Sequence, residues 1–144
     1  MRKPKNVLVF LYRYNSDLEY CLFYRKKEKF WQGISGGVED LETLEDTVKR
    51  EVYEETGIKV NRIIKLDTIS SIPGINVNKM FNYVNNIYVV YEYAFGVLIF
   101  DEEIQLSEEH EKYKWVSYDE AIKLLKYDSN KTALFELNER MKKR

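Results

Sequence analysis

Three glutamates near the middle of the chain have a spacing that suits metal chemistry. Glu51, Glu54 and Glu55 lie at positions i, i+3 and i+4, so a helix would place them on one face within one turn. Like charges at this spacing oppose helix formation by about a few tenths of a kcal/mol, and Arg50 alone cannot neutralise the set. Clustered carboxylate oxygens are typical of a site for a hard divalent cation. The alternative is a solvated acidic helix face.

Hydropathy indicates the elements that must position these glutamates. Residues 6–14 and 18–26 are predicted strands, because the first is apolar throughout and the second alternates. Residues 40–56 have helical periodicity, and Gly57 is well placed to end that helix. The stripe predicted to be buried is Leu41, Leu44, Val48 and Val52.

The second half of the chain mixes predicted strands, loops and helices. Strands are expected at residues 58–69, 87–100 and 112–116, and residues 70–86 are expected to be mostly loop. Two helices close the chain: one is opened by a capping box of Ser117 and Glu120 and runs to about Lys126, and the other is capped by Ser129 and runs to about Arg140. This order predicts an α/β domain with a mixed sheet covered on both faces.

Composition narrows the classes of function. The chain has 144 residues, of which 44% are apolar, and a net charge of −1, so one domain is expected and nucleic acid is not an expected partner. Its single cysteine, Cys21, and single histidine exclude an intramolecular disulfide and a zinc site of their own. There is no signal-peptide pattern and no apolar run of membrane-spanning length, so we expect a soluble cytoplasmic protein without membrane contact.

The residues around the three glutamates follow a longer pattern. Nine positions across residues 36–58 match the Nudix box, Gx5Ex7REUxEExGU, in which U is a bulky aliphatic residue. These positions are Gly36, Glu42, Arg50, Glu51, Val52, Glu54, Glu55, Gly57 and Ile58. The chain therefore resembles the Nudix hydrolases. The resemblance implies one Nudix domain over residues 1–144, an α/β/α sandwich with a central mixed sheet, and cleavage of a diphosphate bond with Mg²⁺ or Mn²⁺.

The resemblance also implies roles for single residues. Glu54 and Glu55 would be metal ligands, together with the main-chain carbonyl of Gly36, and Glu51 would be a ligand or the general base. Glu42 and Arg50 would form an ion pair that orients the loop and the helix of the box. Outside the box, Glu109 would bind a metal or take a proton from water, and Glu92 would be either a further ligand or an outward-facing strand residue.

Motifs beyond the box resemble one branch of the family, the bacterial dihydroneopterin triphosphate pyrophosphatases, which are also described as dATP pyrophosphohydrolases. The matching residues are Phe30, Trp31, Gln32, Glu109, His110, Tyr113, Lys114, Trp115, Ser129 and Asn130. This resemblance implies a nucleoside or pterin triphosphate as substrate and leaves both a monomer and a homodimer open. His110 receives no role.

Substrate contacts can be proposed from residue type. Arg25 and Lys26 would bind phosphate oxygens, although solvated turn charges explain them equally well. Tyr91 would stack on a purine or pterin ring. Two other functions stay open: cleavage of ADP-ribose or another nucleotide-linked diphosphate, to which Pro73 lends weak support, and nucleotide binding without catalysis.

Overall fold

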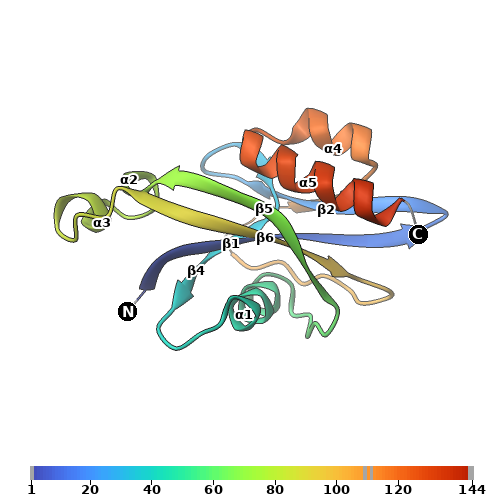
Figure 1. Ribbon diagram of the computed structural model, residues 1–144. Helices are drawn as coiled ribbons and strands as arrows, with labels where there is room; N and C mark the ends of the chain where they lie inside the picture. The colour runs from blue at the N-terminus through green and yellow to red at the C-terminus, as the bar shows by residue number, and fades with distance from the viewer. Residues whose placement is uncertain (1, 109, 111, 143–144) are drawn as a thin grey trace.

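The computed structural model describes residues 2–108, 110 and 112–142, which form a mixed sheet covered by helices on both faces (Figure 1). The described strands are β1 Arg2–Asn15, β2 Asp17–Arg25, β3 Phe30–Gln32, β4 Ile34–Glu39, β5 Ile63–Pro73, β6 Val89–Leu98 and β7 Lys112–Val116. Their order is β3-β2-β1-β6-β5, with β4 paired to β1 and β7 paired to β2. Only β1 and β6 pair in parallel among these strands, so the predicted mixed sheet is confirmed.

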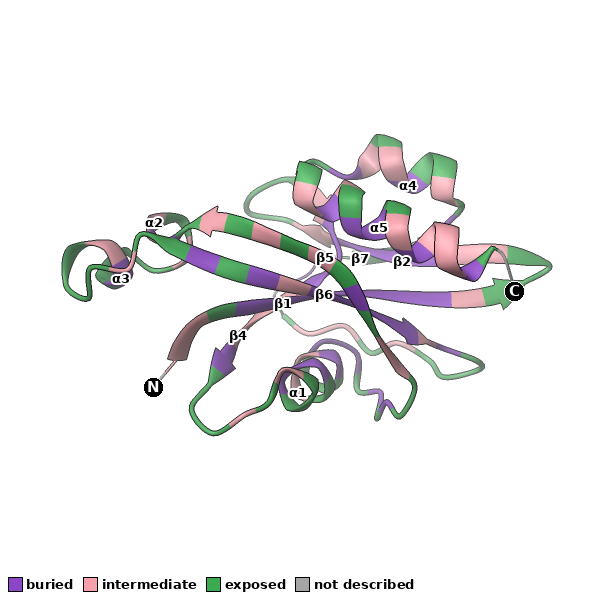
Figure 2. Ribbon diagram, viewed as in Figure 1, coloured by how far each residue is buried: buried purple, intermediate pink, exposed green. Residues whose placement is uncertain are grey.

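The long strand β1 divides the core into two layers. Its side chains alternate, so Val9 faces the helix α1, Leu44–Thr56, whereas Phe10 faces α4, Tyr118–Leu124, and α5, Asp128–Met141. Figure 2 shows this buried band running through the sheet. Burying an apolar side chain of this size contributes about 1.5–3 kcal/mol, so both helix layers are held by β1. Among the described helices, none combines the length and the apolar character that a membrane span requires.

The helix α1 begins later than the periodicity indicates. Thr43 and Asp46 form a reciprocal capping box, and the helix ends at Gly57, whose φ of 75° is left-handed. Leu41 therefore lies outside the helix, with a φ of 72° and 97% of its surface exposed. The prediction that Leu41 is buried was wrong, because the capping box takes residues 40–43 into the preceding loop.

Residues 74–88 contain two short helices and not the expected loop. The strand β5 starts at Ile63 and runs to Pro73; α2, Gly74–Val77, and α3, Lys79–Tyr83, follow. The side chain of Asn78 accepts a hydrogen bond from the Met80 N–H at 2.9 Å and so caps α3. An asparagine that suggested a loop therefore opens a helix, and the pair projects beyond the sheet (Figure 1).

The caps of the last two helices also differ from the prediction. Ser117 accepts from the Glu120 N–H at 3.2 Å, but the Glu120 carboxylate binds Lys114 at 2.7 Å, so the capping box is only half formed. Ser129 lies within the first turn of α5, which begins at Asp128. It is therefore not a cap, and its side chain is left beside the cavity described below.

Candidate active site

A cavity of about 560 Å³ lies where the start of β1 meets α1, α2 and the first turn of α5. Strands β1 to β6 all contribute residues to its wall. The lining residues are Arg2, Asn6, Arg25, Gln32, Ser35, Gly36, Gly37, Glu51, Ile72, Asn76, Val77, Glu92, Tyr127, Ser129 and Asn130.

Two adjacent glycines of β4 allow charged side chains to approach the strand. A Cβ atom on Gly36 would clash with the Glu51 carboxylate, and one on Gly37 would clash with the Arg2 guanidinium. Because the glycines lack side chains, a carboxylate and a guanidinium can both pack against this stretch of backbone. In this chain, neither position has room for a side chain.

Glu51 is the member of the glutamate triplet that reaches this cavity. Its carboxylate accepts from Arg50 Nη1 at 2.9 Å, and 13% of its side chain is exposed. Burial raises the pKa of Glu51 to about 7, partly offset by Arg50. A carboxyl group with this pKa can both hold a cation and exchange a proton near neutral pH.

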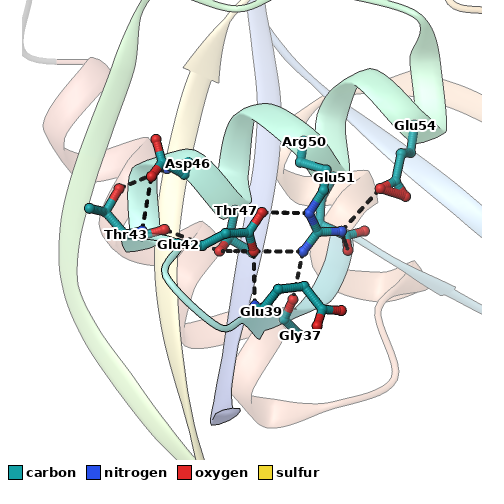
Figure 3. Close-up of polar contacts among 9 residues, drawn as sticks. All are labelled: Gly37, Glu39, Glu42, Thr43, Asp46, Thr47, Arg50, Glu51 and Glu54. Atoms are coloured by element: carbon teal, nitrogen blue, oxygen red, sulfur yellow. Dashed lines mark hydrogen bonds and ion pairs between the residues drawn. The ribbon is translucent and has the colours of Figure 1, made fainter. Parts of the chain in front are cut away.

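Arg50 forms hydrogen bonds with several residues of the Nudix box (Figure 3). Its guanidinium donates to Glu42 at 2.7 and 2.9 Å, to the Gly37 carbonyl at 2.8 Å, and to Glu54 Oε1 at 3.0 Å. The predicted ion pair with Glu42 is confirmed, and it joins the loop to the helix. Hydrogen bonding from Arg50 lowers the pKa of Glu42 to about 2, helped by the Glu39 N–H and Thr47.

The three glutamates do not share one environment. Glu54 has 53% of its side chain exposed and contacts Arg50. Glu55 has only 5% exposed; its Oε2 lies 2.6 Å from His110 Nδ1 and accepts from Ser107 Oγ at 2.7 Å. In the part of the chain that the structure describes, no three His, Cys, Asp or Glu side chains gather at a point that could hold a metal. The three glutamates therefore do not form one cluster: Glu54 contacts Arg50, Glu51 lines the cavity, and Glu55 contacts His110.

Glu92 is a second cavity carboxylate, and the structure excludes the alternative of an outward-facing strand residue. It is buried on β6, where its register partner on β1 is Asn6. Its Oε2 lies 3.5 Å from Ser35 Oγ, and no described residue donates a hydrogen bond to its Oε1. Burial raises the pKa of Glu92 to about 7. A buried carboxylate oxygen without a donor suits a cation ligand.

The expected substrate-binding residues separate in space. Arg25 lines the cavity and forms an ion pair with Glu28 at 3.0 Å. Its Nε is buried and donates no hydrogen bond to any described residue. Lys26 lies in the exposed turn after β2 and is not among the lining residues. Tyr91 is 51% exposed and precedes Glu92 on the strand, so it points to the opposite face of the sheet. Glu109 lies outside the described residues.

Several lining residues were not expected from sequence. Arg2 received no role from the sequence, yet it lines the cavity, bonds Asn6, and has its Cζ 5.4 Å from the centre of the Phe81 ring. Asn6 is a polar residue directly before an apolar run, which is a usable signal. Gln32 was singled out only as part of a motif, and it too lines the cavity.

Comparison with known proteins agrees with this geometry. A family model described as the NUDIX domain matches residues 2–137, and the chain belongs to the Nudix family. It is 32% identical over 126 residues to the asymmetrical bis(5'-nucleosyl)-tetraphosphatase of Rattus norvegicus, covering 85% of this chain and 80% of that protein. It is 28% identical over 148 residues to the dihydroneopterin triphosphate diphosphatase of Escherichia coli strain K12, covering 92% and 91%.

Solved structures give the same family. A NUDIX hydrolase from Listeria monocytogenes has 39% identity and a TM-score of 0.86, covering 98% of this chain and 96% of that one. The dihydroneopterin triphosphate pyrophosphohydrolase of E. coli has 26% identity and a TM-score of 0.77, covering 95% and 97%. The chain is thus an enzyme that hydrolyses diphosphate bonds, and its relatives act on nucleotide-linked small molecules.

Proposed function

We propose that this protein is a Mg²⁺- or Mn²⁺-dependent pyrophosphohydrolase that converts a nucleoside triphosphate such as dATP, or dihydroneopterin triphosphate, to the monophosphate and pyrophosphate. One observation carries the proposal: a single cavity contains the carboxylates of Glu51 and Glu92 together with Gln32, Ser129 and Asn130. The last three are positions at which the chain resembles the dihydroneopterin triphosphate pyrophosphatases.

The donor set supports a hard cation. Glu51, Glu92 and the main-chain carbonyl of Gly36 supply oxygen ligands of the kind that Mg²⁺ prefers, and the Glu92 Oε1 has no described donor. Glu54, Glu55 and Glu109 are further ligands proposed from the family motif. When bound, a divalent ion offsets phosphate charge and activates water.

The remaining roles belong to the chain's own side chains. Arg2 and Arg25 offer guanidinium groups to phosphate oxygens from two sides of the cavity. Arg50 holds Glu51 in place by its hydrogen bond of 2.9 Å. Glu51 or Glu109 takes the proton of the attacking water, and a pKa of about 7 suits Glu51 to that role.

A second candidate is hydrolysis of a dinucleoside tetraphosphate. Its support is the identity of 32% to the rat tetraphosphatase. The ADP-ribose alternative depended on Pro73, which ends β5 and is not among the cavity residues, so the structure adds nothing to it.

A substrate panel tests these functions. The chain would be incubated with Mg²⁺ and dATP, dihydroneopterin triphosphate, diadenosine tetraphosphate or ADP-ribose, and the products identified. We expect pyrophosphate release from the triphosphates and its loss when EDTA is added. ATP plus AMP from the tetraphosphate alone would favour the second candidate. Undiminished hydrolysis in EDTA would refute the metal mechanism, and no turnover at all would favour a binding function.

A further inference from the structure

One end of the sheet carries an apolar surface that no described element covers. In the part of the chain that the structure describes, half of the exposed large apolar side chains lie between residues 69 and 91. They are Ile69, Met80, Tyr83, Val84, Tyr88, Val89 and Tyr91. These residues belong to α3, to its flanks and to the adjoining halves of β5 and β6, where Figure 2 shows exposed segments. We call this set the α3 surface.

Strand register places part of the α3 surface on one face of the sheet. Ser71 pairs with Tyr91 and Ile69 pairs with Tyr93, so Ile69, Val89 and Tyr91 project from the same face. Tyr93 packs against the core beneath α1, and Tyr91, two residues earlier, is half exposed. The helix α1 therefore covers one half of this face and leaves the other half open.

The helix α3 contributes the other part. Met80, Tyr83 and Val84 have the spacing i, i+3 and i+4, so they share one side of the helix, whereas Phe81 is buried on another side. The Ile87 N–H donates to the Phe81 carbonyl at 2.7 Å and ties α3 to the segment that leads into β6. Tyr83 is 71% exposed. Burial within one chain accounts for Phe81 but not for the apolar side that faces outward.

The α3 surface is also depleted of charge. Lys79 is the only charged residue between positions 68 and 91, whereas one third of the whole sequence is charged. Lys5, the register partner of Tyr91 on β1, lies at the rim. A centre poor in charge and rich in tyrosine and methionine, with a polar rim, is the composition of a protein–protein interface.

The exposed area suits a partner protein of ordinary size. With about 200 Å² for a tyrosine and about 100 Å² for an aliphatic side chain, the exposed parts of the seven side chains amount to about 600 Å². This is the upper end of the apolar patches of about 300–600 Å² that monomers expose. Together with the exposed amides of Asn78, Asn85 and Asn86, it approaches the roughly 800 Å² that each partner buries in a standard interface.

We propose that a second copy of this chain binds the α3 surface, which makes the protein a homodimer with a two-fold axis. In such a dimer the surface faces its own equivalent, so a charged group near the axis would meet a like charge. Apolar side chains, tyrosine hydroxyls and asparagine amides can each face an identical group, because hydroxyls and amides both donate and accept. The α3 surface consists of these groups, so it is complementary to itself. The neighbouring helix α2 supplies Asn76 and Val77 to the cavity wall, which places the interface beside the cavity.

Sedimentation equilibrium of the unmodified chain tests the association. No substrate is needed, so the result does not depend on the proposed function. We expect a mass that rises with concentration toward twice that of one chain, with a dissociation constant of about 10 µM or below. The mass of a single chain at about 100 µM would overturn the proposal.

A matched pair of substitutions locates the interface. Tyr83→Glu places two like charges in the dimer and removes an aromatic anchor, so we expect the dissociation constant to rise by at least about 30-fold. Phe135→Glu is the control, because Phe135 is an exposed aromatic residue of α5 outside the α3 surface; it should change the constant by less than about 2-fold. Circular dichroism checks that both variants fold. If the two variants dissociate equally, or if neither does, the dimer uses another surface and the proposal is wrong.

Amide hydrogen exchange of the unmodified protein locates the interface without any substitution. We expect slower exchange at high than at low protein concentration in residues 79–91, with no change in α4. Slower exchange confined to other segments would contradict the proposal. Co-sedimentation with phosphatidylcholine–phosphatidylserine vesicles tests the other occupant: vesicle binding by a chain that stays monomeric in solution would assign the α3 surface to a membrane and overturn the homodimer.

Discussion

Glu51 and Glu55 are one turn apart on α1, yet their charges are stabilised by different means. Glu51 faces a cavity and is held by the cation of Arg50 at 2.9 Å. Glu55 is buried; its Oε2 accepts from Ser107 Oγ at 2.7 Å and lies 2.6 Å from His110 Nδ1. The Glu51 carboxylate faces the cavity, whereas the Glu55 carboxylate contacts protein groups through its Oε2.

The difference shows that a motif fixes spacing but not environment. Both glutamates are fixed positions of the box, and helix geometry puts them on one side of α1. Their surroundings are decided by the chain that packs there: β4 with its two glycines at Glu51, and Ser107 and His110 at Glu55. The same residue type therefore meets an open cavity in one place and hydrogen-bonding groups of the protein in the other.

The largest expected effect is on activity. Glu51→Gln removes the carboxylate charge from the cavity while keeping its shape, so we expect kcat to fall by about 10²-fold or more. Pyrophosphate release measures the change. Glu45→Gln is the matched control, because Glu45 lies on the same helix but is exposed. Near-normal turnover by Glu51→Gln would move the chemistry to Glu92 or Glu109.

The next largest expected effect is on the free energy of unfolding, and it concerns Glu55. Glu55→Ala leaves the donors of His110 and Ser107 without their acceptor in a buried site, so we expect a loss of about 2–3 kcal/mol in the free energy of unfolding. Glu54→Ala should cost within about 0.5 kcal/mol, because Glu54 is largely exposed. Urea unfolding in the presence of a chelator measures both. Equal losses would show that burial does not distinguish the two positions.

Much of the scaffold was accessible from sequence, because apolar alternation and helical periodicity are strong over β1, β2 and α1. The box also predicted the pairing of Glu42 with Arg50. Helix starts were less accessible: periodicity cannot show that Thr43 and Asp46 close a capping box. The helices α2 and α3 have four and five residues, too few for a periodic signal.

The surroundings of the site were the least predictable part. Glu55 meets His110 across 55 positions of sequence, and no local pattern encodes such a contact. Arg2 reaches the cavity because Gly37 leaves room for it. Tyr91 and Glu92 are neighbours in sequence, and only the register of β6 on β1 shows which of them faces the cavity.

Acid should weaken the ion pair between Arg50 and Glu42. The pKa of Glu42 is about 2 in the folded protein, below the ordinary value of 4.5. A lowered folded-state pKa stabilises the protein above the ordinary value, and this contribution is lost as the pH falls from about 4.5 toward 2. The stability difference between the unmodified protein and Glu42→Gln should therefore shrink across this range. A difference independent of pH would show that Arg50 does not stabilise ionised Glu42.

The smallest expected effect is a difference in salt sensitivity between an exposed ion pair, Arg50–Glu54, and a partly buried hydrogen bond, Ser107–Glu55. A double-mutant cycle on Arg50 and Glu54 should give a coupling of about 0.3–0.5 kcal/mol at low salt, as for an exposed pair at i, i+4. A cycle on Ser107 and Glu55 should give about 1 kcal/mol, because this hydrogen bond is partly buried and its acceptor carboxylate is only 5% exposed.

Salt screens charges that solvent can reach, and the Debye length falls from about 10 Å at 0.1 M to about 3 Å at 1 M. The Arg50–Glu54 coupling should therefore be largely lost at 1 M NaCl, whereas the Ser107–Glu55 coupling should persist. Urea unfolding of the four proteins of each cycle at both salt concentrations measures this. If both couplings weakened equally at 1 M NaCl, solvent ions would reach Glu55 as readily as Glu54. The two carboxylates would then not differ in their exposure to solvent.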